Sequence, residues 1–292
     1  ASDVYKRQIE DIKNFRQWES KTPGHPEYNL SSGIEMTTGP LGQGFAHGIG
    51  MAIAERWMAK RYNQPNFNII DNNTYAIVSD GDLQEGVASE AASMAGTLQL
   101  GKVIYLYDDN DISIEGNTDI TFVEDVKKRF EAYGWHVVGP IDGMDTEDLS
   151  AAIEIAKQNE TKPSLIICQT TIGYGSPNKA NTSGVHGEPL GPEETKLTKA
   201  QLGWAYDTPF TIPTEVESHF GRMRDKGTQS QNKCLQLFAE YESIYPVQAT
   251  NLRSEILGEL PTGWDRGLDS LFTDASTTMS CLLYTSPSPR DA

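Results

Sequence analysis

Short apolar segments alternate with longer segments that carry one apolar face, from Thr74 to Thr171. The apolar segments predict buried strands, and the longer segments predict helices. We expect strands at residues 74–80, 102–110, 136–143 and 164–170, and helices at about 87–98, 122–134 and 146–159. Strands that alternate with helices at this spacing form parallel βαβ units. The sequence therefore predicts an α/β fold, a doubly wound and mostly parallel sheet with helices on both faces.

Two local patterns concern how helices begin. Thr121 and Glu124 have the spacing of a capping box at the first turn of the second predicted helix. Further upstream, TTGPLGQG (Thr37–Gly44) precedes a segment rich in glycine and alanine. Backbone without bulky side chains can lie flat against an aromatic ring system or pack tightly against a neighbouring element. Both interpretations are compatible with a helix that begins after this turn.

The charge of the chain excludes two classes of partner. Its 292 residues include 41 acidic and 24 basic side chains, which give a formal net charge of −17. Such a surface repels nucleic acids and anionic membranes, so we expect neither as a partner. No apolar run approaches the roughly 20 residues that span a bilayer. The three cysteines, Cys168, Cys234 and Cys281, are far apart, which argues against a disulfide framework and fits a cytoplasmic location.

Ligands of such sheets bind beyond the carboxyl ends of the strands. Asp80 and Gly81 follow the first predicted strand, and Asn110 ends the second. On its own, Asp80 is more typical of a helix cap. If the two strands are neighbours, however, the Asp80 carboxylate and the Asn110 amide oxygen lie side by side and suit Mg²⁺. A diphosphate would supply the missing ligands, and the helix that begins near Glu85 would point its positive end at the phosphates.

This pattern resembles the motif that binds thiamine diphosphate, in which an Asp-Gly turn is followed by an asparagine after the next strand. The motif usually begins Gly-Asp-Gly, whereas this chain has Ser79 in the first position. The resemblance implies that Asp80 and Asn110 bind Mg²⁺ (or Ca²⁺) through their side chains and Ile112 through its carbonyl. It also implies that Gly81 and Asn110 contact the cofactor, with Gly81 offering its backbone to the diphosphate.

Further segments resemble the transketolase family. They occur in the family's order over most of the chain, from about Ile9 to about Gly258: KTPGHPE (Lys21–Glu27), TTGPLGQG, DGDLQEG, YDDNDISIEG, and IGYGSPNKA followed by VHG. Any one of these segments is weak support, but the combination is specific. The resemblance implies that Gly39, Pro40 and Leu41 line the pyrimidine or diphosphate end of the cofactor.

The same resemblance assigns roles to two histidines and a glutamate. Without it, His25 and His186 would be ordinary surface histidines, and Glu85 would be a charge that caps a helix. With it, both histidines face the reactive carbon of the cofactor, hydrogen-bond sugar hydroxyls and transfer protons. His186 also contacts a cofactor phosphate, and Glu85 belongs to a network that links the two cofactors of a homodimer.

The implied reaction is the transfer of a two-carbon ketol unit from a ketose phosphate to an aldose phosphate, with this chain anchoring the diphosphate. Dihydroxyacetone synthase or another thiamine-diphosphate enzyme is an alternative, as is a non-catalytic half-subunit of a split transketolase. We expect an extraneous leader at 1–8, the diphosphate-binding domain at 9–245, a linker towards an absent pyrimidine-binding domain at 246–280 and an extraneous tail at 281–292. The glutamate that activates the cofactor lies on that second domain in the family, so we expect this chain alone to be inactive.

Overall fold

The computed structural model describes residues 8–28, 34–260 and 263–267. The chain divides into two compact units, Ala1–Leu235 and Gln236–Ala292. Of the predicted leader only Gln8 is described, and the predicted tail at 281–292 lies outside the described residues. Within the described ranges, no helix is both long enough and apolar enough to cross a bilayer.

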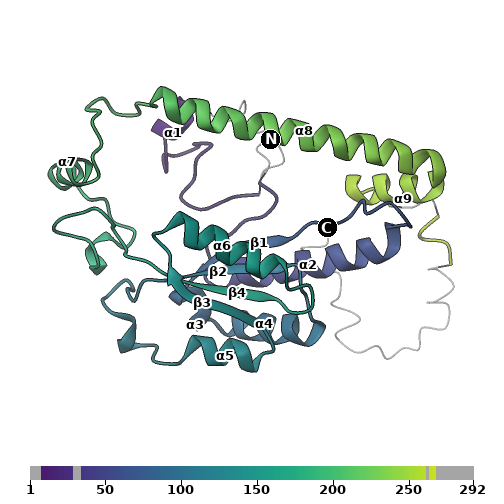
Figure 1. The fold of residues 1–292 in the computed structure, drawn as a ribbon, viewed down its shortest axis with the longest axis horizontal. Helices are drawn as coiled ribbons and strands as arrows, with labels where there is room; N and C mark the ends of the chain where they lie inside the picture. Colours follow the sequence, from purple (N-terminus) through teal and green to yellow (C-terminus); the bar gives the residue numbers. More distant parts are fainter. Residues whose placement is uncertain (1–7, 29–33, 261–262, 268–292) are drawn as a thin grey trace, which may run out of the picture. The chain divides into compact units, whose positions relative to one another are not determined.

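A four-stranded parallel sheet lies in the first unit (Figure 1). Its strands are β1 (Thr74–Ser79), β2 (Val103–Asp109), β3 (His136–Asp142) and β4 (Ser164–Gln169), in the spatial order β1-β2-β4-β3. The four predicted strands and their parallel arrangement are confirmed. The pairing of β1 with β2 sets Ser79 beside Asp108, so the residues that follow these two strands leave the sheet side by side.

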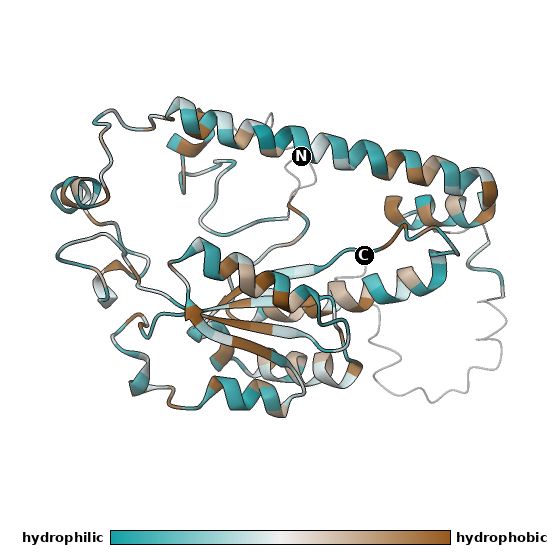
Figure 2. Ribbon diagram, in the orientation of Figure 1, coloured by the Kyte–Doolittle hydropathy of each residue, from teal (hydrophilic) through white to brown (hydrophobic). Residues whose placement is uncertain are grey.

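Helices cover both faces of the sheet, as predicted (Figure 1). The first unit contains α1 (Ile9–Lys13), α2 (Gln43–Tyr62), α3 (Asp80–Gln84), α4 (Gly86–Leu98), α5 (Val126–Ala132), α6 (Thr146–Lys157) and α7 (Pro192–Gln201). Side chains of β2 alternate between two cores. Tyr105 and Tyr107 pack with α2, α4 and α5, whereas Ile104 packs with Ala152 and Ala156 of α6. Hydrophobic residues accordingly line the strands and the helix faces turned towards them (Figure 2).

The two edge strands differ from the central pair. On one edge, β3 contains Pro140, and its pairing with β4 shifts register between Val138 and Ile141, which an edge strand tolerates. On the opposite edge, β1 turns an apolar face to solvent, because Tyr75 is 49% exposed and Ile77 is 79% exposed. The face of β1 that α2 covers is buried, whereas its other face is left open.

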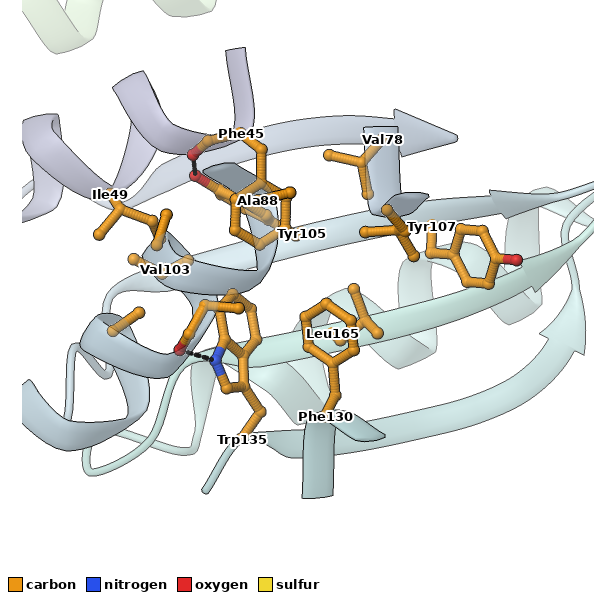
Figure 3. Close-up of a cluster of buried hydrophobic side chains, with 14 of the residues drawn as sticks. Phe45, Ile49, Val78, Ala88, Val103, Tyr105, Tyr107, Phe130, Trp135 and Leu165 are labelled. Carbon is orange, nitrogen blue, oxygen red and sulfur yellow. Dashed lines mark hydrogen bonds between the residues drawn. The ribbon is translucent and has the colours of Figure 1, made fainter. Parts of the chain in front are cut away.

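Aromatic side chains join α2 and α4 to the sheet through packing and hydrogen bonds (Figure 3). The Tyr105 hydroxyl donates to the Phe45 carbonyl at 2.7 Å, and the two rings meet edge to face with centroids 4.8 Å apart. The Trp135 indole donates to the Ala92 carbonyl of α4 at 2.8 Å. Gly48 of α2 lies against the same tyrosine, since a methyl group there would lie 2.1 Å from the Tyr105 hydroxyl oxygen. At Gly48, then, the small residues of α2 serve tight packing inside the protein.

The capping box predicted for Thr121 and Glu124 is wrong. The N-cap of α5 is instead Asp125, whose carboxylate accepts a hydrogen bond from the Lys128 N–H at 3.0 Å. Glu124 forms an ion pair with Arg129. Asp125 displaces the predicted cap because aspartate is itself a preferred N-cap and lies directly before the first apolar residue of the helix.

The second unit combines the end of α8 (Thr214–Ile244) with α9 (Pro246–Leu257). Tyr241 is fully buried, and Glu242 forms an ion pair with Arg253 of α9 at 3.0 Å between Oε2 and Nη2. The first part of the segment that we expected to be a linker is therefore a packed helix.

We predict that Gly48→Ala destabilises the fold, whereas Gly50→Ala on the same helix does not. The methyl group at Gly48 would push the Tyr105 hydroxyl away from Phe45, which costs about 2–3 kcal/mol of unfolding free energy through overpacking and a lost hydrogen bond. Gly50 has open space around it, so alanine there stabilises by about 0.5–1 kcal/mol through helix propensity. Urea unfolding followed by circular dichroism measures both variants, and equal effects would contradict the packing at Gly48.

Candidate functional site

Asp80 lies where β1 ends and α3 begins, at the edge of the sheet formed by the carboxyl ends of the strands, called here the carboxyl edge. Its side chain is buried, with the residue only 4% exposed. Oδ1 accepts a hydrogen bond from the Tyr107 hydroxyl, whereas Oδ2 is buried and has no partner among the described residues. Burying a carboxylate oxygen without a partner is costly. A cation would compensate for that cost at this atom.

Several carboxylates gather around Asp80. Burial is the main reason why the pKa of Asp80 rises to about 6, and the charges of Asp109, Asp111 and Asp108 add to the rise. The hydrogen bond from Tyr107 acts in the opposite direction. Burial and the charge of Asp111 also raise the pKa of Asp109. A divalent cation at this edge would therefore reduce the mutual repulsion of several negative charges.

Asn110 follows β2, the strand that pairs with β1, and its side-chain amide has a defined orientation. Nδ2 donates to Oδ2 of Asp108 at 3.1 Å, and Oδ1 accepts from the N–H of Ile112 at 3.0 Å. Because the Asp108 carboxylate requires a donor, the amide oxygen must face the other way, and an amide oxygen has two lone pairs. Thr170, which follows β4, donates its hydroxyl to the same Asp108. Asp80 and Asn110 thus lie on adjacent strand ends, and their joint binding of a metal ion stays a prediction.

The carbonyl of Ile112, in the loop after β2, accepts no backbone hydrogen bond among the described residues. Ile112 forms an isolated antiparallel bridge with Asn117. The hydrogen bonds of this bridge run between flanking residues, from the Thr118 N–H to the Asp111 carbonyl and from the Ser113 N–H to the Gly116 carbonyl. The bridge therefore holds the loop in shape without using the Ile112 carbonyl, the atom that the sequence analysis assigns to the metal.

The loop at residues 39–42 reaches the same carboxyl edge. A methyl group on Gly39 would lie 2.7 Å from Cγ of His25, and one on Gly81 would lie 3.2 Å from Cδ1 of Leu41. His25 therefore packs on Gly39, and Leu41 packs on the turn after Asp80, with Pro40 between them in the loop. Gly39 also has a φ of +132°, a region that side-chain-bearing residues rarely adopt. The structure thus brings one predicted catalytic residue and the predicted cofactor loop to the Asp80 turn.

Asp82 ties this loop to the turn after β1. Its Oδ1 accepts from the Gly42 N–H at 2.8 Å, and its Oδ2 accepts from the N–H and hydroxyl of Ser79 at 3.0 and 3.2 Å. Ser79 and Asp82 form a capping box at the start of α3, where Ser79 has an extended backbone with φ of −121°. Serine therefore fits where the motif usually has glycine. Glu85, the N-cap of α4, lies against Gly42, because a methyl group there would be 2.8 Å from its Cβ.

His186 occupies the long loop between β4 and α7, directly after a 3₁₀ turn, η3 (Ser183–Val185). Val185 packs on Gly173, where a methyl group would lie 2.9 Å from its Cγ2, so this loop returns to the segment that leaves β4. The imidazole of His186 is exposed and makes no hydrogen bond with any other residue in the described part of the chain. The structure therefore brings the His186 loop to the carboxyl edge but leaves its imidazole unengaged.

Two residues of the site were missed by sequence analysis. Tyr107 lies on the same face of β2 as Tyr105 and therefore looks like an ordinary core residue, although its hydroxyl reaches Asp80. Asp82 looks like a solvated charge, but its spacing of three residues from Ser79 is a capping-box signal that could have identified it. Among the residues that the structure describes, no three His, Cys, Asp or Glu side chains are grouped to hold a metal ion. The predicted ligand set would not form such a group, because it contains one carboxylate, one amide oxygen and one backbone carbonyl.

The fold and this edge define a class, the α/β domains that bind a cofactor beyond the carboxyl ends of parallel strands. Comparison with known families refines it, because residues 3–261 match the family described as "Transketolase, thiamine diphosphate binding domain". The chain belongs to the transketolase family, within its thiamine-diphosphate-binding domain.

Individual relatives agree with this membership. Transketolase of Bacillus subtilis (strain 168) is 55% identical over 259 residues, which cover 88% of this chain and 39% of that protein. A solved transketolase from Pichia stipitis in complex with sedoheptulose 7-phosphate has a TM-score of 0.86 at 44% identity, covering 90% of this chain and 39% of that one. Transketolase from Leishmania mexicana has a TM-score of 0.85 at 40% identity, covering 94% and 40%. The chain spans about two fifths of the length of these relatives.

We predict that Mg²⁺ binding by the chain weakens as the pH falls through about 6, because Mg²⁺ requires the ionised Asp80 carboxylate. The raised pKa also means that ionised Asp80 destabilises the metal-free fold above pH 6, a cost that disappears as the pH falls towards 3.8. Asp80→Asn should therefore stabilise the metal-free chain at pH 7 by about 1–3 kcal/mol.

Thermal unfolding between pH 5 and 8, with and without Mg²⁺, measures both effects. Asp80→Asn should abolish the rise in melting temperature that Mg²⁺ causes. Asp142→Asn is the matched control, since Asp142 ends β3 at the same edge of the sheet but is exposed. A Mg²⁺ response that survives in Asp80→Asn would contradict the assignment of Asp80 as the metal ligand.

Asp82→Ala should loosen the loop at residues 39–42 by leaving the Gly42 N–H without its acceptor. We expect a loss of about 1–3 kcal/mol in unfolding free energy and faster amide exchange at Gly42. Asp148→Ala is a matched control, because Asp148 is also the third residue of a helix but is exposed. Hydrogen exchange at Gly42 that is equal in the two variants would show that Asp82 does not hold the loop.

Proposed function

We propose that the chain is the diphosphate-anchoring part of a transketolase, which transfers a two-carbon ketol unit between sugar phosphates with the help of thiamine diphosphate and Mg²⁺. Membership of the thiamine-diphosphate-binding family supports the cofactor. The substrate class is drawn from relatives, since solved Pichia stipitis transketolases are described in complex with fructose 6-phosphate and with sedoheptulose 7-phosphate. Both sugars are ketose phosphates, the class that we assign as donor.

The buried Oδ2 of Asp80 is the observation that carries the proposal. It lies at the carboxyl edge without a hydrogen-bond partner among the residues that the structure describes, near carboxylates that disfavour an uncompensated charge. Oxygen atoms are the ligands that Mg²⁺ prefers, and Mg²⁺ in proteins is commonly shared between one or two carboxylates and substrate phosphates. Oδ2 of Asp80, Oδ1 of Asn110 and the carbonyl of Ile112 would supply the protein's share. The diphosphate would complete the shell.

The remaining residues would hold the cofactor and the sugar. Gly81 and the loop of Gly39, Pro40 and Leu41 present backbone with little side-chain bulk at the same edge, which allows a ligand to approach closely. When bound, thiamine diphosphate supplies the carbon nucleophile and the electron sink for cleavage of a carbon–carbon bond beside a carbonyl. The chain's own part is to anchor and orient it.

Proton transfer and sugar recognition would fall to His25 and His186. An imidazole titrates near neutral pH and can donate or accept a proton, so each histidine can hydrogen-bond a sugar hydroxyl and shuttle its proton. His25 is the better placed of the two in this chain, because it packs directly on Gly39 of the cofactor loop. His186 would contact a phosphate of the cofactor from its own loop.

A homodimer is part of the same proposal, with Glu85 in a network that links the two cofactors. Glu85 occupies the N-cap position of α4, without a side-chain capping bond, and lies against Gly42, so it connects the cofactor loop to that helix. The helix also carries exposed apolar side chains, Met94 and Leu98, which are 45% and 41% exposed. Exposed apolar surface of this kind suits contact with a second subunit.

Calorimetric titration of the chain with thiamine diphosphate tests the anchoring function. We expect binding with Mg²⁺ present, at least tenfold weaker binding after chelation of the metal, and similarly weak binding of thiamine, which lacks the diphosphate. Binding that ignores both the metal and the diphosphate would contradict the proposal.

Ketol transfer tests the activity. We expect none from the chain alone with fructose 6-phosphate as donor. Activity should appear when the remainder of the Bacillus subtilis relative is added as a separate polypeptide. Asp80→Asn should prevent this complementation, whereas Asp142→Asn should not. Activity that survives in Asp80→Asn would argue that the cofactor is held elsewhere.

A further inference from the structure

The loop that carries His186 is held by hydrogen bonds to a buried carboxylate, that of Glu194, to which the proposed function assigns no role. Glu194, in the first turn of α7, is only 8% exposed. Its Oε1 accepts from the Ser176 hydroxyl and, at 2.9 Å, from the Asn178 N–H, while its Oε2 accepts from Nδ2 of Asn178 at 2.9 Å. Three donors from one short segment thus converge on a single carboxylate.

The segment that is hydrogen-bonded to Glu194, residues 176–178, belongs to a stretch that is bonded to residues on both sides, at Ile172 and at Leu190. Ser176, which is 4% exposed, accepts from the Lys179 N–H at 3.1 Å. The ammonium group of Lys179 donates to the Leu190 carbonyl at 3.1 Å, and the Asn181 N–H donates to the Ile172 carbonyl at 2.8 Å. Residues 172–181 therefore form a unit closed by the bond between Asn181 and Ile172, and Glu194 binds two of its residues, Ser176 and Asn178.

His186 follows this unit by five residues, and its approach to the carboxyl edge depends on it. Thr182 donates its hydroxyl to the Lys179 carbonyl, and Val185 packs on Gly173 within the closed unit. The imidazole itself is exposed and forms no hydrogen bond within the part of the chain that the structure describes. The position of His186 is consequently set by the backbone that leads to it, which Glu194 holds.

We propose that Glu194 is a positioning residue that keeps His186 at the carboxyl edge, where the cofactor phosphate would bind. The effect on His186 is a property of the loop alone. The effect on ligand affinity rests on the proposed function, because it requires that His186 contacts the diphosphate.

The chemistry of the contact requires a carboxylate. A glutamine has one acceptor oxygen, so its amide group would face either the donors at Oε1 or the donor at Oε2. The hydrogen bonds from Ser176 and Asn178 lower the pKa of Glu194, so it is ionised at neutral pH. Glu193, its exposed neighbour in the same helical turn, offers a matched control for the loss of one negative charge.

Hydrogen exchange of the full 292-residue chain tests the positioning. In Glu194→Gln, we expect amide exchange across residues 176–186 to rise at least tenfold, with exchange in the four strands unchanged. Glu193→Gln should leave the same amides within twofold of the unaltered chain. If Glu194→Gln does not fold, Ser176→Ala removes one donor only and should give a smaller rise in the same amides. Unchanged exchange at residues 176–186 in the folded variant would overturn the proposal.

A second measurement separates action through His186 from general destabilisation. Titration with thiamine diphosphate and Mg²⁺ should show about five- to tenfold weaker binding for Glu194→Gln. In chains that also carry His186→Ala, Glu194→Gln should cause less than a twofold further loss. An equal loss with and without His186→Ala would overturn the positioning role. No binding by the unaltered chain would overturn the proposed function instead, since the exchange measurement does not depend on the ligand.

Discussion

The buried carboxylate of Asp80 is the constraint on which the carboxyl edge of this protein depends. One of its oxygens accepts from Tyr107, the other is buried with no hydrogen-bond donor among the described residues, and the charges of nearby aspartates act on the whole carboxylate. A fold retains such an arrangement only if something else compensates for it. Under the function proposed above, a cation and the phosphates of the cofactor would supply that compensation, and membership of a thiamine-diphosphate-binding family supports the cofactor part of this proposal.

Acidic residues in this chain also hold loops together through hydrogen bonds. Asp82, Asp108 and Glu194 each collect hydrogen bonds from neutral donors on loops that are distant in sequence, rather than from a basic side chain. A carboxylate offers two oxygens and about four acceptor positions, so it can join backbone N–H groups, hydroxyls and amides at one point. Part of the net charge of −17 is thus used to shape the loops around the site.

Sequence periodicity was enough to predict the four strands, their parallel pairing and the helices between them. That Asp80 and Asn110 follow neighbouring strands was only a condition of the metal-site prediction, because periodicity does not fix strand order, and the pairing of β1 with β2 meets that condition. Three features could not be predicted this way. The helix at α3 is too short to have a period, α5 begins after Asp125 rather than after Thr121, the predicted cap four positions earlier, and the Tyr107 hydroxyl reaches Asp80 through the fold's geometry. The roles of His25 and His186 came from family resemblance alone, and they remain predictions.

The outer edge of β1 has a consequence for the tendency of this polypeptide to self-associate in solution. Edge strands present unpaired backbone groups, and proteins usually blunt them with charge, proline or a covering segment. Here the open face beside that edge carries Tyr75 and Ile77, which are neither charged nor covered by another described residue to any large extent. Self-association should therefore grow steeply with protein concentration, and mild detergent or a charged replacement at Ile77 would be the practical remedy for anyone purifying it.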